Sequence, residues 1–164
     1  MKLKIANKIH MPGIIDIWEE YVDYHSQIDP FFTRRDKNND RFIKYIQDQL
    51  LSSKSFLLVC LNAEKVVGYS LAQIRMYPPL FQQTRYGYIS DLAVKLDYMK
   101  NGTGDFLLAG IIKWFKSKHI ERVELQVFAH NKMGNSFWKK HGFEEFKYVM
   151  KIEFCDDVML EIPK

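Results

Sequence analysis

The sequence predicts an α/β (α+β) protein built on a mixed, mostly antiparallel sheet of six or seven strands, with helices on both faces. Two observations lead to this prediction. Short runs of apolar or alternating residues, typical of strands, are separated by segments whose apolar residues recur at helical spacing. In addition, residues 86–115 pass from a strand pattern through a glycine turn directly into a helical pattern. At 164 residues, we expect a single domain over residues 1–164.

The first third of the chain is predicted to hold one strand and two helices. Residues 2–6 alternate apolar residues with lysines, which indicates a strand near a sheet edge. Pro12 suits the first turn of a helix that ends near His25, and Asn39 or Asp40 can cap a second helix. The residues expected to face inward on the two helices are Ile14, Trp18, Tyr21, Val22, Phe42, Ile43, Ile46 and Leu50.

The segment between these helices shows no periodicity, but it carries two adjacent aromatic residues. Phe31 and Phe32 lie beside Arg34 and Arg35, and large apolar groups in a loop need cover. One interpretation is that both phenylalanines pack into the core or against a second copy of the chain. The acidic residues expected on the solvated side of the first helix are Asp16, Glu19, Glu20 and Asp23.

The middle of the chain predicts three strands and a helix. Residues 55–61 are almost continuously apolar, as in a strand that is buried on both faces. After a turn, residues 66–76 return as a long strand that two prolines end. Residues 88–94 are rich in apolar, aromatic and β-branched residues, which predicts a central strand, and a helix is expected from Asp105. The inward stripe of that helix is Leu107, Leu108, Ile111, Ile112 and Phe115.

The last third predicts further strands around a short helix. Residues 122–128 alternate as a strand does, and residues 132–141 form a helix that Gly142 closes in the left-handed conformation. Residues 146–154 alternate aromatic or aliphatic with polar side chains, which predicts a long strand. Residues 158–162 add another short strand or lie against a partner subunit, so a homodimer is one expectation.

The composition argues against several classes of function. No apolar run approaches the ~20 residues of a membrane helix, and no signal-peptide pattern opens the sequence, so we expect a cytoplasmic protein without a membrane partner. The two cysteines, Cys60 and Cys155, lie outside any metal-binding spacing, so neither a metal nor a disulfide is expected. The net charge of +4 is mild, and nucleic-acid binding is the weakest interpretation of the basic residues.

The turn between the central strand and its helix has the chemistry of an anion site. Gly102 and Gly104 flank Thr103, and glycine lets backbone N–H groups point into one concavity with no Cβ in the way. The unpaired N–H groups and the positive dipole end of the helix add to the field. Such a turn attracts a phosphate or pyrophosphate, although a plain connecting turn explains two glycines equally well.

Two motifs give this turn a family context. Met-Lys-Asn-Gly-Thr-Gly occupies residues 99–104, and N-K-M-G-N-S-F-W-K-K-H-G-F runs from Asn131 to Phe143. With the order of elements, they make the sequence resemble the GNAT superfamily of acyl-CoA-dependent N-acyltransferases over essentially the whole chain. The motifs of that family are Gln/Arg-x-x-Gly-x-Gly/Ala and Asn-x-x-Ala/Gly-x-x-Phe-Tyr-x-Lys-x-Gly-Phe. Met99 departs from the first motif, and Trp138 stands at the tyrosine of the second.

The resemblance implies acetyl-CoA as co-substrate and a splayed pair of central strands whose opening takes the pantetheine arm. Backbone N–H groups of residues 92–94 would hold the thioester carbonyl, and Asn131 would bond the arm or the backbone beside it. The residues expected to bind CoA are Leu92, Ala93, Val94, Met99, Lys100, Asn101, Gly102, Thr103, Gly104, Asp105, Asn131, Trp138 and Lys140.

The general base is harder to assign from the sequence. An alkylammonium with a pKa of ~10 must lose a proton before it attacks a thioester. Many relatives carry a glutamate on the central strand or at the position of Gln126, which is neutral here. Asp91, His130 and His25 are therefore the candidates, and a structural hydrogen bond is the alternative for each. Strand alternation turns Asp91 away from the face of Tyr88 unless a bulge rotates it.

The leaving thiolate and the acceptor also need partners. The usual proton donor is the motif tyrosine, and the indole of Trp138 cannot replace it, so Tyr88, Tyr98 or a water molecule are the alternatives. A thiol with a pKa of ~8.5 leaves readily enough that the missing acid should slow the reaction rather than abolish it. In similar proteins the loop after the first helix forms a wall of the acceptor site. The expected acceptor-binding residues are His25, Phe32, Tyr88 and Ser90.

The resemblance predicts an N-acetyltransferase that moves an acetyl group from acetyl-CoA to a primary amine of a small molecule or peptide by direct attack. The alternative is a non-catalytic acyl-CoA-binding module or sensor with the same fold, which Trp138 favours. The sequence leaves open which amine is acetylated.

Overall fold

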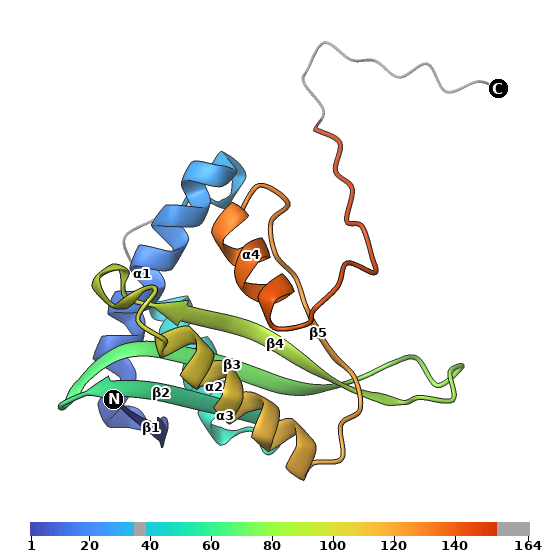
Figure 1. Ribbon diagram of the computed structural model, residues 1–164, viewed down its shortest axis with the longest axis horizontal. Coiled ribbons are helices and arrows are strands. Elements are labelled where there is room, and N and C mark those ends of the chain that lie inside the picture. Colours follow the sequence, from blue (N-terminus) through green and yellow to red (C-terminus); the bar gives the residue numbers. More distant parts are fainter. Residues whose placement is uncertain (35–38, 154–164) are drawn as a thin grey trace. The chain divides into compact units, whose positions relative to one another are not determined.

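The computed structural model describes residues 1–34 and 39–153, and the chain divides into two compact units, residues 1–128 and 129–164 (Figure 1). The main elements of the first unit are β1 (Lys2–Ile5), α1 (Met11–Ile28), α2 (Asp40–Leu51), β2 (Ser55–Asn62), β3 (Lys65–Met76), β4 (Arg85–Val94), α3 (Thr103–Ser117) and β5 (Val123–Leu125). None of the helices in the described ranges is both long and apolar enough to cross a membrane.

The first unit contains a five-stranded sheet in the order β1-β2-β3-β4-β5. The first four strands are antiparallel neighbours, and β5 runs parallel to β4. This arrangement confirms the mixed, mostly antiparallel sheet, but the predicted count of six or seven strands is too high for the described residues. The strand predicted over residues 146–154 is not formed within 146–153, and residues 158–162 lie outside the described part.

Helices of the first unit cover both faces of the sheet. Helix α1 packs on β3 and β4 and α2 packs on β2, while α3 packs on β2, β3 and β4 from the other side (Figure 1). Two glycines permit the close approach. A Cβ on Gly13 of α1 would come within 2.7 Å of Val66, and one on Gly110 of α3 would come within 2.8 Å of Leu58.

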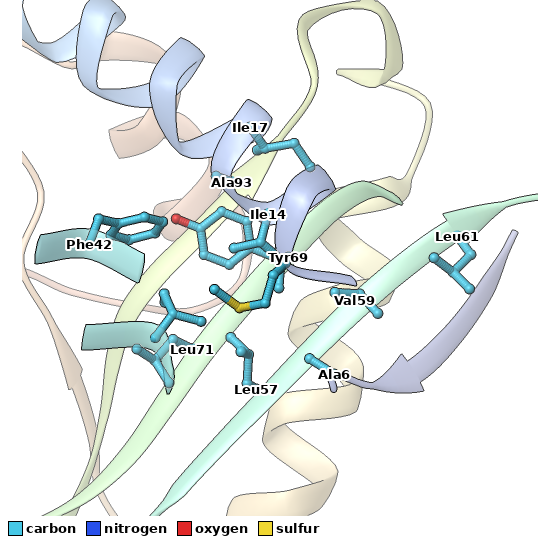
Figure 2. Close-up of a cluster of buried hydrophobic side chains, with 12 residues drawn as sticks. Ala6, Ile14, Ile17, Phe42, Leu57, Val59, Leu61, Tyr69, Leu71 and Ala93 are labelled. Carbon is cyan, nitrogen blue, oxygen red and sulfur yellow. The ribbon is translucent and has the colours of Figure 1, made fainter. Parts of the chain in front are cut away.

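The core under α1 and α2 surrounds Tyr69, whose ring lies among apolar side chains from both helices and the sheet (Figure 2). The predicted inward residues Ile14, Phe42 and Ile46 are buried, and Ile17, which the prediction left out, is buried as well. Burial of a side chain of this size contributes about 1.5–3 kcal/mol, so this layer holds the helices on the sheet.

The strands β4 and β5 pair over a short distance and then part. Their register runs from Gly87 opposite Val123 to Ile89 opposite Leu125, and no later residue of β4 is paired with β5. Strand β5 is therefore shorter than the predicted strand over residues 122–128. The expected splayed pair is present in the first unit.

The second unit holds one helix, α4 (Lys132–Lys140). The side chain of Asn131 caps it by accepting a hydrogen bond from the N–H of Gly134 at 2.9 Å, and Gly142 follows it with φ +83°, as the predicted left-handed closure requires. Residues 144–153 form neither helix nor strand and are exposed, with Met150 at 92%. Apolar and polar residues do alternate in this segment, but a strand forms only where the segment can pair with the edge of another strand.

Candidate active site

A β-bulge in β4 decides which side chains face α1 and α2. Leu71 of β3 is paired with Asp91 and Ala72 with Ile89, so Ser90 is an extra residue on β4. Leu71 belongs to the core under α1 and α2. Paired residues share a face, so the bulge brings Asp91 to that face, where simple alternation would have turned it away. The exception named for strand alternation therefore applies, and the orientation that alternation alone predicts for Asp91 is wrong.

The carboxyl group of Asp91 is costly to keep in this place. The side chain is mostly buried, and burial raises its pKa from 3.8 to about 6. The Oγ of Ser70 donates to the backbone carbonyl of Asp91, not to its carboxylate. Within residues 1–34 and 39–153, no hydrogen bond or ion pair compensates the carboxylate. A charge that is desolvated and left uncompensated is typical of a functional carboxylate.

Tyrosines from four elements interact electrostatically with this carboxyl group or with one another. Burial and the charge of Asp91 raise the pKa of Tyr21 on α1, Tyr45 on α2 and Tyr69 on β3. The Tyr69 hydroxyl is buried and has no hydrogen-bond partner in the described part of the chain. The charge of Tyr88 also acts on Tyr21. We call these four tyrosines, with Ser90 and Asp91, the Asp91 cluster.

Backbone donors point to the open edge of β4 immediately after Asp91. The N–H of Lys95 donates to the carbonyl of Val67 on β3 at 2.9 Å. Because N–H groups of successive strand residues alternate in direction, the N–H groups of Leu92 and Val94 point to the other side. On that side β5 has already parted from β4. Two main-chain donors therefore face the splay, next to the carboxylate.

The hinge at residues 99–104 has the backbone geometry of an anion cradle. Lys100 and Gly102 both adopt positive φ, at 60° and 80°. Helix α3 begins at Thr103, two residues before the predicted Asp105, and its first hydrogen bond runs from the N–H of Phe106 to the carbonyl of Gly102. The earlier N–H groups of this turn have no partner within the helix. Apart from Gly102 and its two chain neighbours, no described residue has an atom within 4 Å of the place where a Cβ on Gly102 would stand, so the cradle opens outward.

The comparisons with known proteins agree with this geometry. The family model described as the Acetyltransferase (GNAT) family matches residues 14–143. The chain belongs to the GNAT family of acetyltransferases. Proteins of this family use acetyl-CoA. No curated protein matches the sequence.

Solved structures share the GNAT fold of this chain. A tetramutant of the BH1408 protein from Bacillus halodurans is 24% identical, with a TM-score of 0.83 over 94% of this chain and 100% of that one. The aminoglycoside antibiotic 6'-N-acetyltransferase AAC(6')-IG from Acinetobacter haemolyticus is 14% identical, with a TM-score of 0.75 over 96% and 100%. The aminoglycoside N-acetyltransferase AAC(6')-Iy in complex with CoA is 14% identical, with a TM-score of 0.70 over 94% and 100%. These likenesses show the fold alone.

His25 and Phe32 lie in an aromatic group at the end of α1, away from the hinge. The Nδ1 of His25 lies 2.7 Å from the carbonyl oxygen of Tyr21, which can only accept, so Nδ1 carries the proton. Its ring packs on Tyr21, and the ring of Phe128 lies between His25 and Phe32, 5.2 and 4.8 Å from them. Phe31 is 83% exposed, so the interpretation that it packs into the core is wrong. These contacts give His25 a structural role.

The acidic residues of α1 are paired with two basic side chains from elsewhere in the first unit. Arg34 contacts Glu19 at 3.1 Å and Asp23 at 3.0 Å, and Lys95 contacts Asp16 at 2.8 Å. Glu20 lies 3.8 Å from the same lysine. The face predicted as solvated charge is therefore partly ion-paired, and its four carboxylates against two cations leave about two negative charges there.

Within the second unit, the predicted CoA residues have structural partners. Asn131 is buried, and its Oδ1 caps α4. Trp138 packs edge-on against Phe143, with ring centroids 5.2 Å apart. His130 and Lys140 are exposed. In the part of the chain that is described, no group of histidine, cysteine or acidic residues could hold a metal ion.

Tyr45, Tyr69 and Arg75 interact with Asp91 or its neighbours and were not predicted from the sequence. Tyr69 and Arg75 alternate with Leu71 on β3, so strand periodicity alone would have placed them on one face. That this face also receives Asp91 could not be read from the sequence, because it depends on the bulge at Ser90.

Proposed function

We propose that this GNAT protein is an N-acetyltransferase in which Asp91 deprotonates a primary amine that attacks acetyl-CoA directly. The observation that carries the proposal is the uncompensated, mostly buried carboxylate of Asp91, next in the chain to main-chain donors that face the splay of β4 and β5. A carboxyl group with a pKa of about 6 is ionised at neutral pH and still basic enough to accept a proton.

Binding of the co-substrate is assigned to the first unit. The diphosphate would lie on the N–H groups of residues 100–105, where positive φ at Lys100 and Gly102 turns successive donors outward. The pantetheine arm would follow the open edge of β4. The thioester carbonyl would accept hydrogen bonds from Leu92 or Val94, which stabilise the negative charge that develops on this oxygen.

The chemical step then needs two proton transfers. The ammonium gives one proton to the Asp91 carboxylate, and the amine lone pair forms a bond to the carbonyl carbon. The tetrahedral adduct expels the thiolate as the C–S bond breaks, and the nitrogen loses its second proton. The net products are the N-acetyl amide, the CoA thiol and one proton released to solvent. Tyr88 in the Asp91 cluster, Tyr98 after β4 and a water molecule remain the candidates for the acid, because the indole of Trp138 carries no transferable proton.

A second function is favoured by one observation. Trp138 replaces the tyrosine of the family motif, as expected of an acyl-CoA sensor that binds without turnover. Both proteins would bind CoA, and only the enzyme would consume acetyl-CoA in the presence of an amine.

The test measures release of the CoA thiol from saturating acetyl-CoA with a broad panel of primary amines. We expect amine-dependent release by the wild type, and a loss of about 100-fold or more in Asp91→Asn. Asp48→Asn on the exposed surface of α2 is the matched control and should behave as the wild type. If no amine raises thiol release above hydrolysis while calorimetry detects CoA binding, the protein is the sensor and the enzymatic proposal is wrong.

A further inference from the structure

Arg75 of β3 lies on the same face of the sheet as the Asp91 cluster. On β3, Leu71 is paired with Asp91 and Gln73 with Tyr88, and Arg75 is the next residue on that face. The guanidinium lies over Tyr88, and the pair Gln73–Tyr88 is the neighbour, on this face, of the pair Leu71–Asp91. Arg75 takes no part in the proposed chemical step.

The guanidinium of Arg75 is fixed by its neighbours. Its central carbon lies 3.5 Å from the centroid of the Tyr88 ring. Its Nε and Nη2 donate to the Oε1 of Gln73 at 3.1 and 2.7 Å, and Gln73 is itself held by the Oε1 of Gln49 at 2.7 Å. Among the residues that the structure describes, Arg75 has no acidic partner, whereas Arg34 makes two ion pairs. A preorganised cation without an anion is a binding group for an oxyanion.

The two uncompensated charges are close enough for one small molecule to reach both. The charge of Asp91 raises the pKa of Tyr45 and the charge of Arg75 lowers it, so this phenol responds to both groups. Tyr88, under the guanidinium, is one row of the pleat away from Asp91, and two residues of a strand span about 7 Å. A carboxylate and a guanidinium at this spacing are complementary to a cation and an oxyanion in one ligand.

We propose that the acceptor is a zwitterion, a primary amine joined to a carboxylate or phosphate through a chain of about five carbons, whose extended length matches this spacing. The inference rests on the proposed function and narrows its substrate class. The amine nitrogen lies at Asp91, and the oxyanion accepts hydrogen bonds from the N–H groups of Arg75 that Gln73 does not use. Carboxylates and phosphates share this fork geometry, so the recognised chemistry is the oxyanion.

The experiment compares four acceptors of similar length: 6-aminohexanoate, 5-aminopentyl phosphate, hexylamine and 1,6-diaminohexane. We expect kcat/KM of the wild type to be at least about tenfold higher for one or both anionic acceptors than for hexylamine. Arg75→Gln should reduce that ratio to within about threefold, and Arg75→Lys should retain part of it. Arg85→Gln is the matched control, because Arg85 lies on the opposite face and donates to the carbonyl of Lys118.

A binding measurement separates this inference from the proposed function. Thermal protection by the same four compounds is measured for each variant with CoA present, and circular dichroism shows whether the variants fold. Protection by an anionic acceptor that is lost in Arg75→Gln supports the zwitterion site, even if no turnover occurs. The proposal is overturned if neither anionic acceptor is used or protects better than hexylamine, or if such a preference survives in Arg75→Gln. Preference for 1,6-diaminohexane overturns it as well.

Discussion

Replacing Asp91 with asparagine should weaken the enzyme and stabilise the fold at the same time. Folding raises the pKa of this carboxyl group from 3.8 to about 6, because the ionised form is desolvated and has no compensating partner among the described residues. Two pKa units correspond to about 3 kcal/mol. The residue keeps some contact with water, which screens the cost, so we expect about 1–3 kcal/mol.

The sign of the effect depends on pH. Between about pH 4 and 6, Asp91 is protonated in the folded state and ionised in the unfolded state. The free energy of unfolding therefore falls as the pH rises from about 4 through about 6. Below pH ~4 both states are protonated and the cost disappears. Asp91→Asn therefore gains stability over the wild type at pH 7 and little at pH 4, provided that the wild type remains folded there.

Urea unfolding at the two pH values measures this difference directly, and the same preparation is assayed for turnover. A gain of 1–3 kcal/mol would raise the melting temperature by roughly 3–9 °C in a domain of this size. Asp48→Asn is the control and should change neither quantity. Equal stability of wild type and Asp91→Asn at pH 7, or a gain of the same size at pH 4, would refute the reasoning about desolvation.

Three further substitutions test the rest of the site. Gly102→Ala places a Cβ on a residue with φ +80°, which costs about 1–2 kcal/mol of folding free energy. Calorimetry should show weaker CoA binding by this variant. Unchanged affinity would show that the hinge at residues 99–104 does not bind CoA. Asn131→Ala removes the cap of α4 and should lower the unfolding free energy by about 1 kcal/mol, whereas a larger loss in CoA affinity alone would indicate a ligand contact. Trp138→Tyr supplies a phenol and should raise kcat severalfold if protonation of the thiolate limits the rate; an unchanged kcat would assign that proton to another group.

The parts of the fold that depend on local patterns could be predicted from the sequence. The stripe at Ile14, Phe42 and Ile46 identified the buried faces of α1 and α2, and the glycines at 102 and 104 identified the turn at which α3 begins. Each of these features needs only the residue types and their spacing, because helical periodicity and the conformational freedom of glycine act within a few residues.

The parts that depend on pairing between distant segments could not be predicted. The extra residue at Ser90 arises from the register between β3 and β4, and it alone moves Asp91 to the face of Leu71. The alternation in residues 146–154 predicts a strand, but it does not say which edge the segment would join. The convergence of Tyr21 and Tyr45 on one carboxylate likewise requires two helices to be packed on the sheet.

The most direct test of the account is a titration of the Asp91 carboxyl carbon by NMR in the folded protein with CoA bound, using Asp91→Asn to assign the signal. We predict a midpoint of about 6, matched by the acidic limb of kcat/KM for a good acceptor. A titration midpoint near 4 would contradict the assignment of Asp91 as the base. So would a residual kcat/KM of Asp91→Asn that still falls with the same midpoint as the pH is lowered.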